Sequence, residues 1–196
     1  YESLFSNTTG VNNTGIGYRA GNLITSGINN IAIGNDAQVP SGTSSNQVRI
    51  GNTSIFYAGI QVAWTITSDR RWKQDILTSN LGLGFITKLI PVSYTRINDE
   101  NQKTEYGFIA QDIEKALQDC GIDNSGMITI DENGRYELRY NDLFAPMVKA
   151  IQELKKENDA LKNEVESLKE SVQRISELEE IVIKLSKSKE SRLADR

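Results

Sequence analysis

Ser68 and Lys73 are the two side chains in this sequence best suited to covalent chemistry. The chain contains no histidine, and a serine nucleophile activated by a lysine amine is one of the few arrangements that breaks a peptide bond without one. Both residues lie in the segment SDRRWKQDI, residues 68–76, between a Gly/Asn-rich half and a charged, helix-prone half. If they form a catalytic dyad, the predicted target is the chain's own bond between Thr67 and Ser68.

The spacing of the two residues restricts how they can meet. Five positions place side chains about 140° apart on a helix and on opposite faces of a strand. The segment must therefore turn between Ser68 and Lys73, and Asp69 is the expected N-cap of a helix that begins at this turn. Alternatively, the two side chains meet across subunits.

Activation of the lysine sets a second requirement. A lysine acts as a general base only when its amine is neutral, so its pKa must fall by several units from about 10.4. Trp72 is the candidate for apolar cover, and Arg70 and Arg71 are the candidates for nearby positive charge. The alternative interpretation is a solvated, charged turn that joins two modules, since a serine five residues before a lysine occurs by chance in many proteins.

Composition argues against several classes of function. The net charge of −4 and the pI near 5.1 predict no binding to nucleic acid or to an anionic membrane surface. The sequence has no apolar run of the roughly 18 residues that a membrane span requires. The single cysteine, Cys120, excludes an intramolecular disulfide, and no metal or other cofactor is expected. Tyr1 in place of methionine suggests a fragment of a longer protein.

The first part of the chain contains a repeat of 17 residues. It reads NNTGIG at 12–17, NNIAIG at 29–34 and NQVRIG at 46–51. A fixed short period with Gly/Asn turns is typical of stacked β-strands, and Ile16, Ile33 and Ile50 are the expected inward residues. Residues 1–67 are therefore expected to form a stacked β repeat rather than a Gly-rich linker. The repeats also resemble the stacked β stalks and heads of trimeric fibres and autotransporter adhesins, and this resemblance implies the end of a trimeric β stalk.

The pattern changes several times between the repeat and the C-terminal region. Residues 55–58 and 62–66 are strand-like, and residues 81–89 have helical spacing of apolar positions that Pro91 ends. Residues 68–140 are expected to fold as a small α+β module. Its other predicted elements are strands at 92–97 and 105–110, a helix at 111–118, and strands at 127–130 and 135–139 that flank the hairpin turn Asn133-Gly134.

Residues 141–196 have the pattern of a long coiled-coil helix. Apolar residues recur three and four positions apart, with Glu and Lys between them. Asn158 is a polar residue in this series, a common means of fixing register and strand number. After Ile175 the series continues with a three-residue step. The core positions are Ile151, Leu154, Asn158, Leu161, Val165, Leu168, Val172 and Ile175, followed by Leu178, Ile181 and Leu185.

Four segments, in order over residues 67–170, resemble the peptidase S74 family, the C-terminal intramolecular chaperone domains of phage tail spikes, tail fibres and neck appendages. They are SDRRWKQDI, GLGFITKLIPVSY, GFIAQDIE and YNDLFAPMVKAIQELKKENDALK. The resemblance implies that the domain trimerises, assists folding of the preceding β-rich fibre, and then releases itself by cutting before Ser68. It also implies that Ser68 is the nucleophile and Lys73 the base, and that Asp69 has an orienting role.

The favoured hypothesis is therefore a homotrimeric, self-cleaving chaperone whose folding client is its own N-terminal fibre domain. It would belong to a virion tail fibre or spike and act in the host cytoplasm during assembly, and a cell-surface receptor is the expected partner of an upstream fibre region. One alternative is a non-enzymatic trimeric stalk or anchor of a surface adhesin. Another is a membrane-tethered transcription factor released by the same cut, which requires a basic upstream region and an apolar span that do not occur in this sequence.

Overall fold

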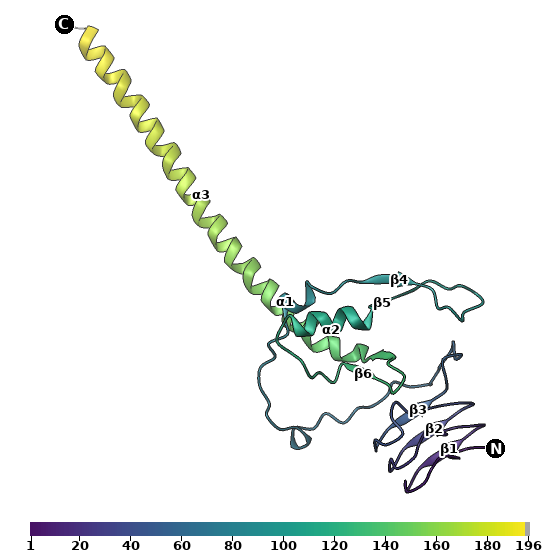
Figure 1. The fold of residues 1–196 in the computed structure, drawn as a ribbon. Coiled ribbons are helices and arrows are strands. Elements are labelled where there is room, and N and C mark those ends of the chain that lie inside the picture. Colours follow the sequence, from purple (N-terminus) through teal and green to yellow (C-terminus); the bar gives the residue numbers. More distant parts are fainter. Residues whose placement is uncertain (195–196) are drawn as a thin grey trace.

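The computed structural model describes residues 1–194, and it describes the side chains of residues 1–185 and 187. A stack of short strands contains the N-terminus, a small mixed module follows it, and one long helix runs away from the module to the opposite end (Figure 1). The predicted α+β class is confirmed. The trimeric stalk and the domain boundaries remain predictions.

The three repeats form three parallel rungs. Their strands are β1 (Thr14–Ile16), β2 (Ile31–Ile33) and β3 (Val48–Ile50). They pair in the order β1-β2-β3 with a register of 17 residues, so that Thr14 lies opposite Ile31, and Ile31 opposite Val48. A glycine ends each strand with positive φ (+123° at Gly17 and +118° at Gly34), which is a backbone conformation that glycine adopts without strain. The sequence period therefore equals the distance along the chain between stacked rungs.

The interior of the stack combines a buried asparagine with apolar side chains that include Ile24 and Val39. Asn30 is fully buried; its backbone N–H donates to Asn13 Oδ1 (2.9 Å), and its Oδ1 accepts from the backbone N–H of Gln47 (2.9 Å). Ala20, Ala32 and Ala37 form a small apolar cluster. Hydrogen bonds from one rung to the next therefore satisfy the buried polar groups of Asn30.

The prediction that the three isoleucines point inward is wrong. Ile16 is 59% exposed and Ile50 65% exposed, while Ile33 is half-buried. Side chains alternate along a strand, and the inward position is the middle residue of each strand, such as the fully buried Ala32 of β2. Ile16, Ile33 and Ile50, which share a register position, therefore form an outward apolar column.

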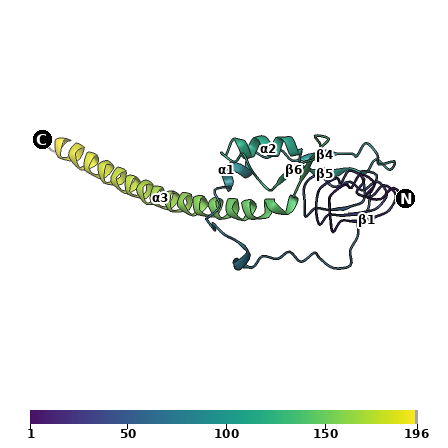
Figure 2. The same ribbon diagram turned by 60° about the horizontal axis from the view of Figure 1, so that its bottom comes forward.

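The module consists of two short helices and two antiparallel strand pairs. The helices are α1 (Leu83–Ile86) and α2 (Ala110–Gln118), and the strands are β4 (Val92–Tyr94) paired with β5 (Glu105–Gly107) and β6 (Ile128–Ile130) paired with β7 (Tyr136–Leu138). Gly134, in the predicted hairpin turn between β6 and β7, has φ +74°. The strands predicted at 55–58 and 62–66 are not formed. Those residues are exposed and lie in a long arc away from the module (Figure 2).

Phe85 is the largest side chain of the module's core and is 1% exposed. It packs with Leu81, Ile113, Ala116, Leu117, Met127 and Leu143, and Cys120 packs half-buried at the edge of this cluster. We expect Phe85→Ala to lower the free energy of unfolding by about 3–5 kcal/mol, because it removes buried surface and leaves a cavity. Urea unfolding measures the change. Tyr106→Ala is the control, since Tyr106 is 82% exposed, and an equal loss in both variants would contradict the assigned core.

The C-terminal helix α3 (Phe144–Ala194) follows a short 3-10 helix, η2 (Tyr140–Leu143). The predicted long helix is confirmed up to Ala194, and the last two residues of its predicted range, 195–196, lie outside the described residues. Its core series is exposed in the single chain, as at Leu161 (60%) and Val172 (64%). Such an unpaired apolar series is typical of a coiled coil seen without its partner strands. No helix in the described part of the chain is long and apolar enough to cross a membrane.

Glu153 joins α3 to α1. The backbone N–H of Leu83 donates to Glu153 Oε2 (2.6 Å), and Lys149 lies 3.4 Å from Oε1. The hydrogen bond from Leu83, and secondarily Lys149, lowers the pKa of the Glu153 carboxyl below its ordinary value of 4.5. The carboxylate therefore stabilises the fold above that value, and this contribution is lost as pH falls through the lower pKa of the folded state.

We expect the stability difference between the wild type and Glu153→Gln to shrink between about pH 6 and about pH 3. Urea unfolding at a series of pH values measures this difference. Glu166→Gln is the control, because Glu166 lies on the exposed part of α3 and its side chain is 68% exposed. A difference that stays constant over this range would show that the Leu83 contact does not depend on the carboxylate charge.

Candidate active site

A tight turn follows Ser68. Asp69 is the N-cap of the 3-10 helix η1 (Arg70–Trp72), and its Oδ1 accepts the backbone N–H of Arg71 at 2.8 Å. The Arg71 guanidinium also pairs with the same carboxylate at 2.6 Å. Hydrogen bonds from the Arg71 side chain, and then from its backbone, lower the pKa of Asp69. The predicted N-cap is confirmed, and an ionised Asp69 holds the turn in shape.

The turn brings Ser68 and Lys73 together within one chain. Lys73 is extended and its backbone N–H donates to the carbonyl of Arg70 (3.1 Å), which reverses the chain direction. Its Nζ then donates to Ser68 Oγ at 2.8 Å. A protonated lysine in this position donates to the hydroxyl. For general-base catalysis, the proton must move the other way, from Oγ–H to a neutral amine.

The predicted surroundings of the lysine are not found among the residues that the structure describes. Trp72 is 81% exposed, and both Ser68 and Lys73 are exposed. Arg71 pairs with Asp69 and so does not act as a free positive charge beside the amine. Desolvation is the main means of favouring a neutral lysine, so a neutral Lys73 would need cover from outside this turn.

The backbone amides of the turn are also engaged. Those of Arg71, Trp72 and Lys73 donate to Asp69 Oδ1, the Asp69 carbonyl and the Arg70 carbonyl, respectively. An oxyanion at the Thr67 carbonyl needs donors that are free and preorganised. These three amides do not meet that requirement while η1 is formed.

The turn lies in a segment, residues 53–80, that is exposed apart from the half-buried Asp69. The same segment carries many large apolar side chains, whereas a soluble monomer rarely exposes so many together. Figure 2 shows it as an arc between the β stack and α1 that does not run along the module. The exposed apolar residues are Ile55, Phe56, Tyr57, Ile60, Val62, Trp64, Ile66, Trp72, Ile76 and Leu77.

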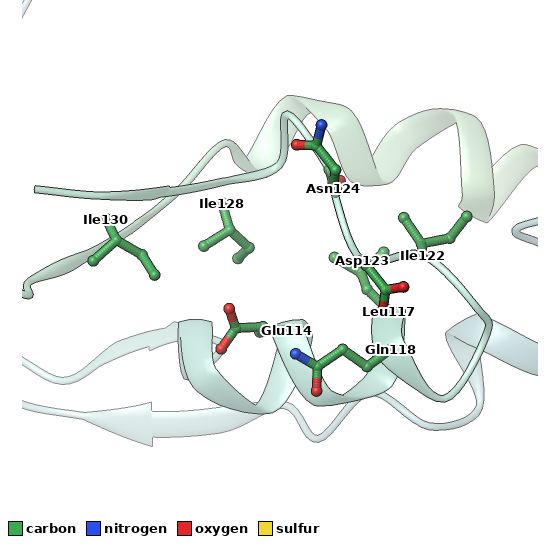
Figure 3. Close-up of a pocket in the computed structure, with 9 residues that line it drawn as sticks. Glu114, Leu117, Gln118, Ile122, Asp123, Asn124, Ile128 and Ile130 are labelled. Carbon is green, nitrogen blue, oxygen red and sulfur yellow. The ribbon is translucent and has the colours of Figure 1, made fainter.

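A pocket of the module lies between α2 and β6 and is separate from the Ser–Lys pair. Figure 3 shows Glu114 and Gln118 of α2 on one side and Ile128 and Ile130 of β6 on the other. The Glu114 carboxylate accepts a hydrogen bond from the Tyr136 hydroxyl at 3.1 Å. Neither Ser68 nor Lys73 lines this pocket, so it is not the candidate site.

Two of the segments that resemble the family, GFIAQDIE and YNDLF, contact each other in the structure. The motifs alone did not predict this contact. The Tyr140 hydroxyl accepts the backbone N–H of Phe108 (3.2 Å), and a Cβ at Gly107 would lie 2.3 Å from that hydroxyl oxygen. The absence of a side chain at Gly107 therefore leaves room for the Tyr140 hydroxyl, which a larger residue there would displace. The only signal in the sequence was the glycine itself, at the end of a predicted strand.

These features define the class: a small α+β module with a Ser–Lys turn at its N-terminal edge and a long helix at its C-terminal end. Comparison with protein-family models matches residues 68–122 to Peptidase_S74, the chaperone of endosialidase. This part of the chain is therefore similar to that chaperone family. The match begins at Ser68 and does not include the β6–β7 hairpin or α3. The resemblance seen in the sequence extended further, over residues 67–170. Comparison with curated proteins found no match.

Proposed function

We propose that this protein is a trimeric intramolecular chaperone of a phage tail fibre or tail spike, and that it cuts itself once between Thr67 and Ser68. One observation carries the proposal. The Ser68 hydroxyl and the Lys73 amine lie 2.8 Å apart at the residue where the match to the chaperone family begins. The nucleophile would thus be the first residue of the released chaperone.

The reaction follows from this geometry. A neutral Lys73 amine takes the proton of Ser68 Oγ, and Oγ attacks the carbonyl carbon of Thr67. The C–N bond between Thr67 and Ser68 breaks, and the nitrogen takes up a proton and becomes the new amino terminus. This leaves an ester between Thr67 and Ser68 Oγ. Water hydrolyses the ester to a Thr67 carboxylate and a free serine hydroxyl. In direct hydrolysis, the alternative route, water attacks the same carbonyl without the ester.

We propose that assembly completes the site. The turn lacks cover over Lys73 and has no free amide among the three described above for an oxyanion. A neighbouring copy that covers the exposed segment 53–80 would desolvate the lysine and bring in hydrogen-bond donors. The cut would then occur only after the fibre and the chaperone have assembled.

Two unpaired apolar faces on the same chain support self-association. One is the series on α3, and the other is the outward column of Ile16, Ile33 and Ile50 on the β stack. They lie toward opposite ends of the molecule (Figure 1). A second and a third copy around one axis would cover both faces, which agrees with a trimer.

Intact-mass spectrometry of the purified wild-type chain tests cleavage. We expect two species, residues 1–67 and residues 68–196, whose masses together exceed that of the 21.8 kDa chain by one water. A single species at the full mass, under conditions where the protein is a trimer, would contradict self-cleavage. That result would favour the non-enzymatic stalk.

A further inference from the structure

We infer that the β6–β7 hairpin is a docking surface for the third rung of the β stack and that it holds the stack to the module independently of the covalent link. The backbone N–H of Glu132, next to the hairpin turn, donates to the Pro40 carbonyl at 2.9 Å. In return, the backbone N–H of Gly42 donates to Glu132 Oε1 at 2.7 Å. One hairpin residue thus contacts both ends of a three-residue turn of the stack.

This turn has its shape only when the rungs are stacked. The Gly42 carbonyl accepts hydrogen bonds from the backbone N–H groups of Thr25 (2.9 Å) and Gly27 (3.1 Å) in the preceding rung. Gly42 is buried, and a Cβ there would lie 1.9 Å from the Leu23 carbonyl oxygen. The amide that Glu132 binds is therefore positioned by rung stacking, and the hairpin selects the folded stack over an unfolded one.

An ion pair forms the second contact. Arg49, the middle residue of β3, donates through Nη2 to Glu137 Oε1, and Glu137 is the middle residue of β7. The two side chains are 29% and 40% exposed, and Arg49 Nε is buried with no hydrogen-bond partner among the described residues. Loss of Glu137 would leave a half-buried guanidinium unpaired, which is more costly than loss of a surface ion pair.

The placement of these contacts has a consequence for release. Three contacts in the described chain connect residues 1–67 with the module: the two hydrogen bonds of Glu132, with Pro40 and Gly42, and the Arg49–Glu137 ion pair. The segment that carries the proposed cut is exposed and takes no part in them. Breaking one peptide bond in that segment removes none of them. If the proposed cleavage occurs, the two halves stay associated until the hairpin leaves the stack, and salt promotes this step by screening the ion pair.

The docking is tested first without cleavage. In the full-length Ser68→Ala chain, amide hydrogen exchange should show protection at Gly42 and Glu132, and Glu137→Arg should reduce that protection at least tenfold. The reversed pair, Arg49→Glu with Glu137→Arg, should restore it. Glu105→Arg is the matched control, because Glu105 pairs with Arg96 inside the module. Unchanged exchange at Gly42 in Glu137→Arg would overturn the docking surface whether or not the wild type cuts itself.

Retention of the halves is tested in the same uncut protein. Limited trypsin digestion at the exposed Arg70, Arg71 or Lys73 supplies a break close to the proposed cleavage site. On size-exclusion chromatography at low salt, the fragments should co-elute, and Glu137→Arg or high salt should separate them. Separation of the nicked parent chain at low salt would overturn retention. A wild type that never cuts itself would count against the proposed function alone.

Discussion

Ser68→Ala should leave the purified protein as one species of full length, whereas under the proposed function we expect the wild type to yield residues 1–67 and 68–196. The variant removes the only oxygen nucleophile within hydrogen-bond distance of Lys73 Nζ among the described residues, so the loss of cleavage should be complete. A denaturing gel or intact-mass measurement after prolonged incubation detects the result. Ser79→Ala is the matched control, because Ser79 lies in the same exposed segment and hydrogen-bonds locally to Leu81. Cleavage of Ser68→Ala at the wild-type rate would eliminate the proposed mechanism.

Two substitutions at Lys73 distinguish a catalytic role from a structural one. Loss of a general base lowers a rate by about 10²–10⁴-fold, so Lys73→Ala should cut at least a hundredfold more slowly. Lys73→Arg keeps the positive charge and a donor for Ser68 Oγ, but a guanidinium does not become neutral in this pH range. We therefore expect Lys73→Arg to be as inactive as Lys73→Ala. Recovery of cleavage with arginine would show that Lys73 only holds the turn.

The second large effect is expected on α3. Leu161→Asp with Leu168→Asp, made in the Ser68→Ala chain, should convert a trimer of about three times 21.8 kDa into a monomer. Each buried leucine contributes about 1.5–3 kcal/mol relative to an exposed one. The double variant removes six such leucines per trimer and also places carboxylates in an apolar interface. The assembly free energy lost should therefore exceed about 10 kcal/mol. Analytical ultracentrifugation measures the mass.

The control for this experiment introduces the same residue type off the apolar series. Asn163→Asp with Ser167→Asp adds two carboxylates to the same stretch of α3 at positions outside the predicted core, and it should remain trimeric. A Leu161/Leu168 variant that keeps the trimer mass would show that α3 is not the assembly interface. The same double variant with Ser68 present should remain uncut if a neighbouring copy completes the site.

Local patterns were sufficient for much of this fold. The register of the rungs follows from the 17-residue period, because equal spacing in sequence places equivalent residues side by side in a stack. The hairpin follows from Asn133-Gly134, because these residue types accept the backbone conformation of its turn. The long helix follows from its apolar spacing. The turn between Ser68 and Lys73 was predicted for a geometric reason, since no regular element brings side chains five positions apart together.

The tertiary structure alone decided three other matters. It placed Ile16, Ile33 and Ile50 outside the stack, because the middle residue of each strand, such as the buried Ala32, faces the interior and strand alternation then turns the isoleucines outward. It left the apolar segment 53–80 exposed in the described part of the chain, although residues 55–58 and 62–66 had been predicted to form strands. It also set the hairpin against the third rung through Glu132 and Glu137.

The sequence by itself thus determined the chemistry available at Ser68 and Lys73, together with the elements whose periods are local. It did not determine which surfaces meet. Contacts such as Arg49 with Glu137 join residues far apart in the chain, and they depend on how separately folded elements pack rather than on any spacing along the sequence.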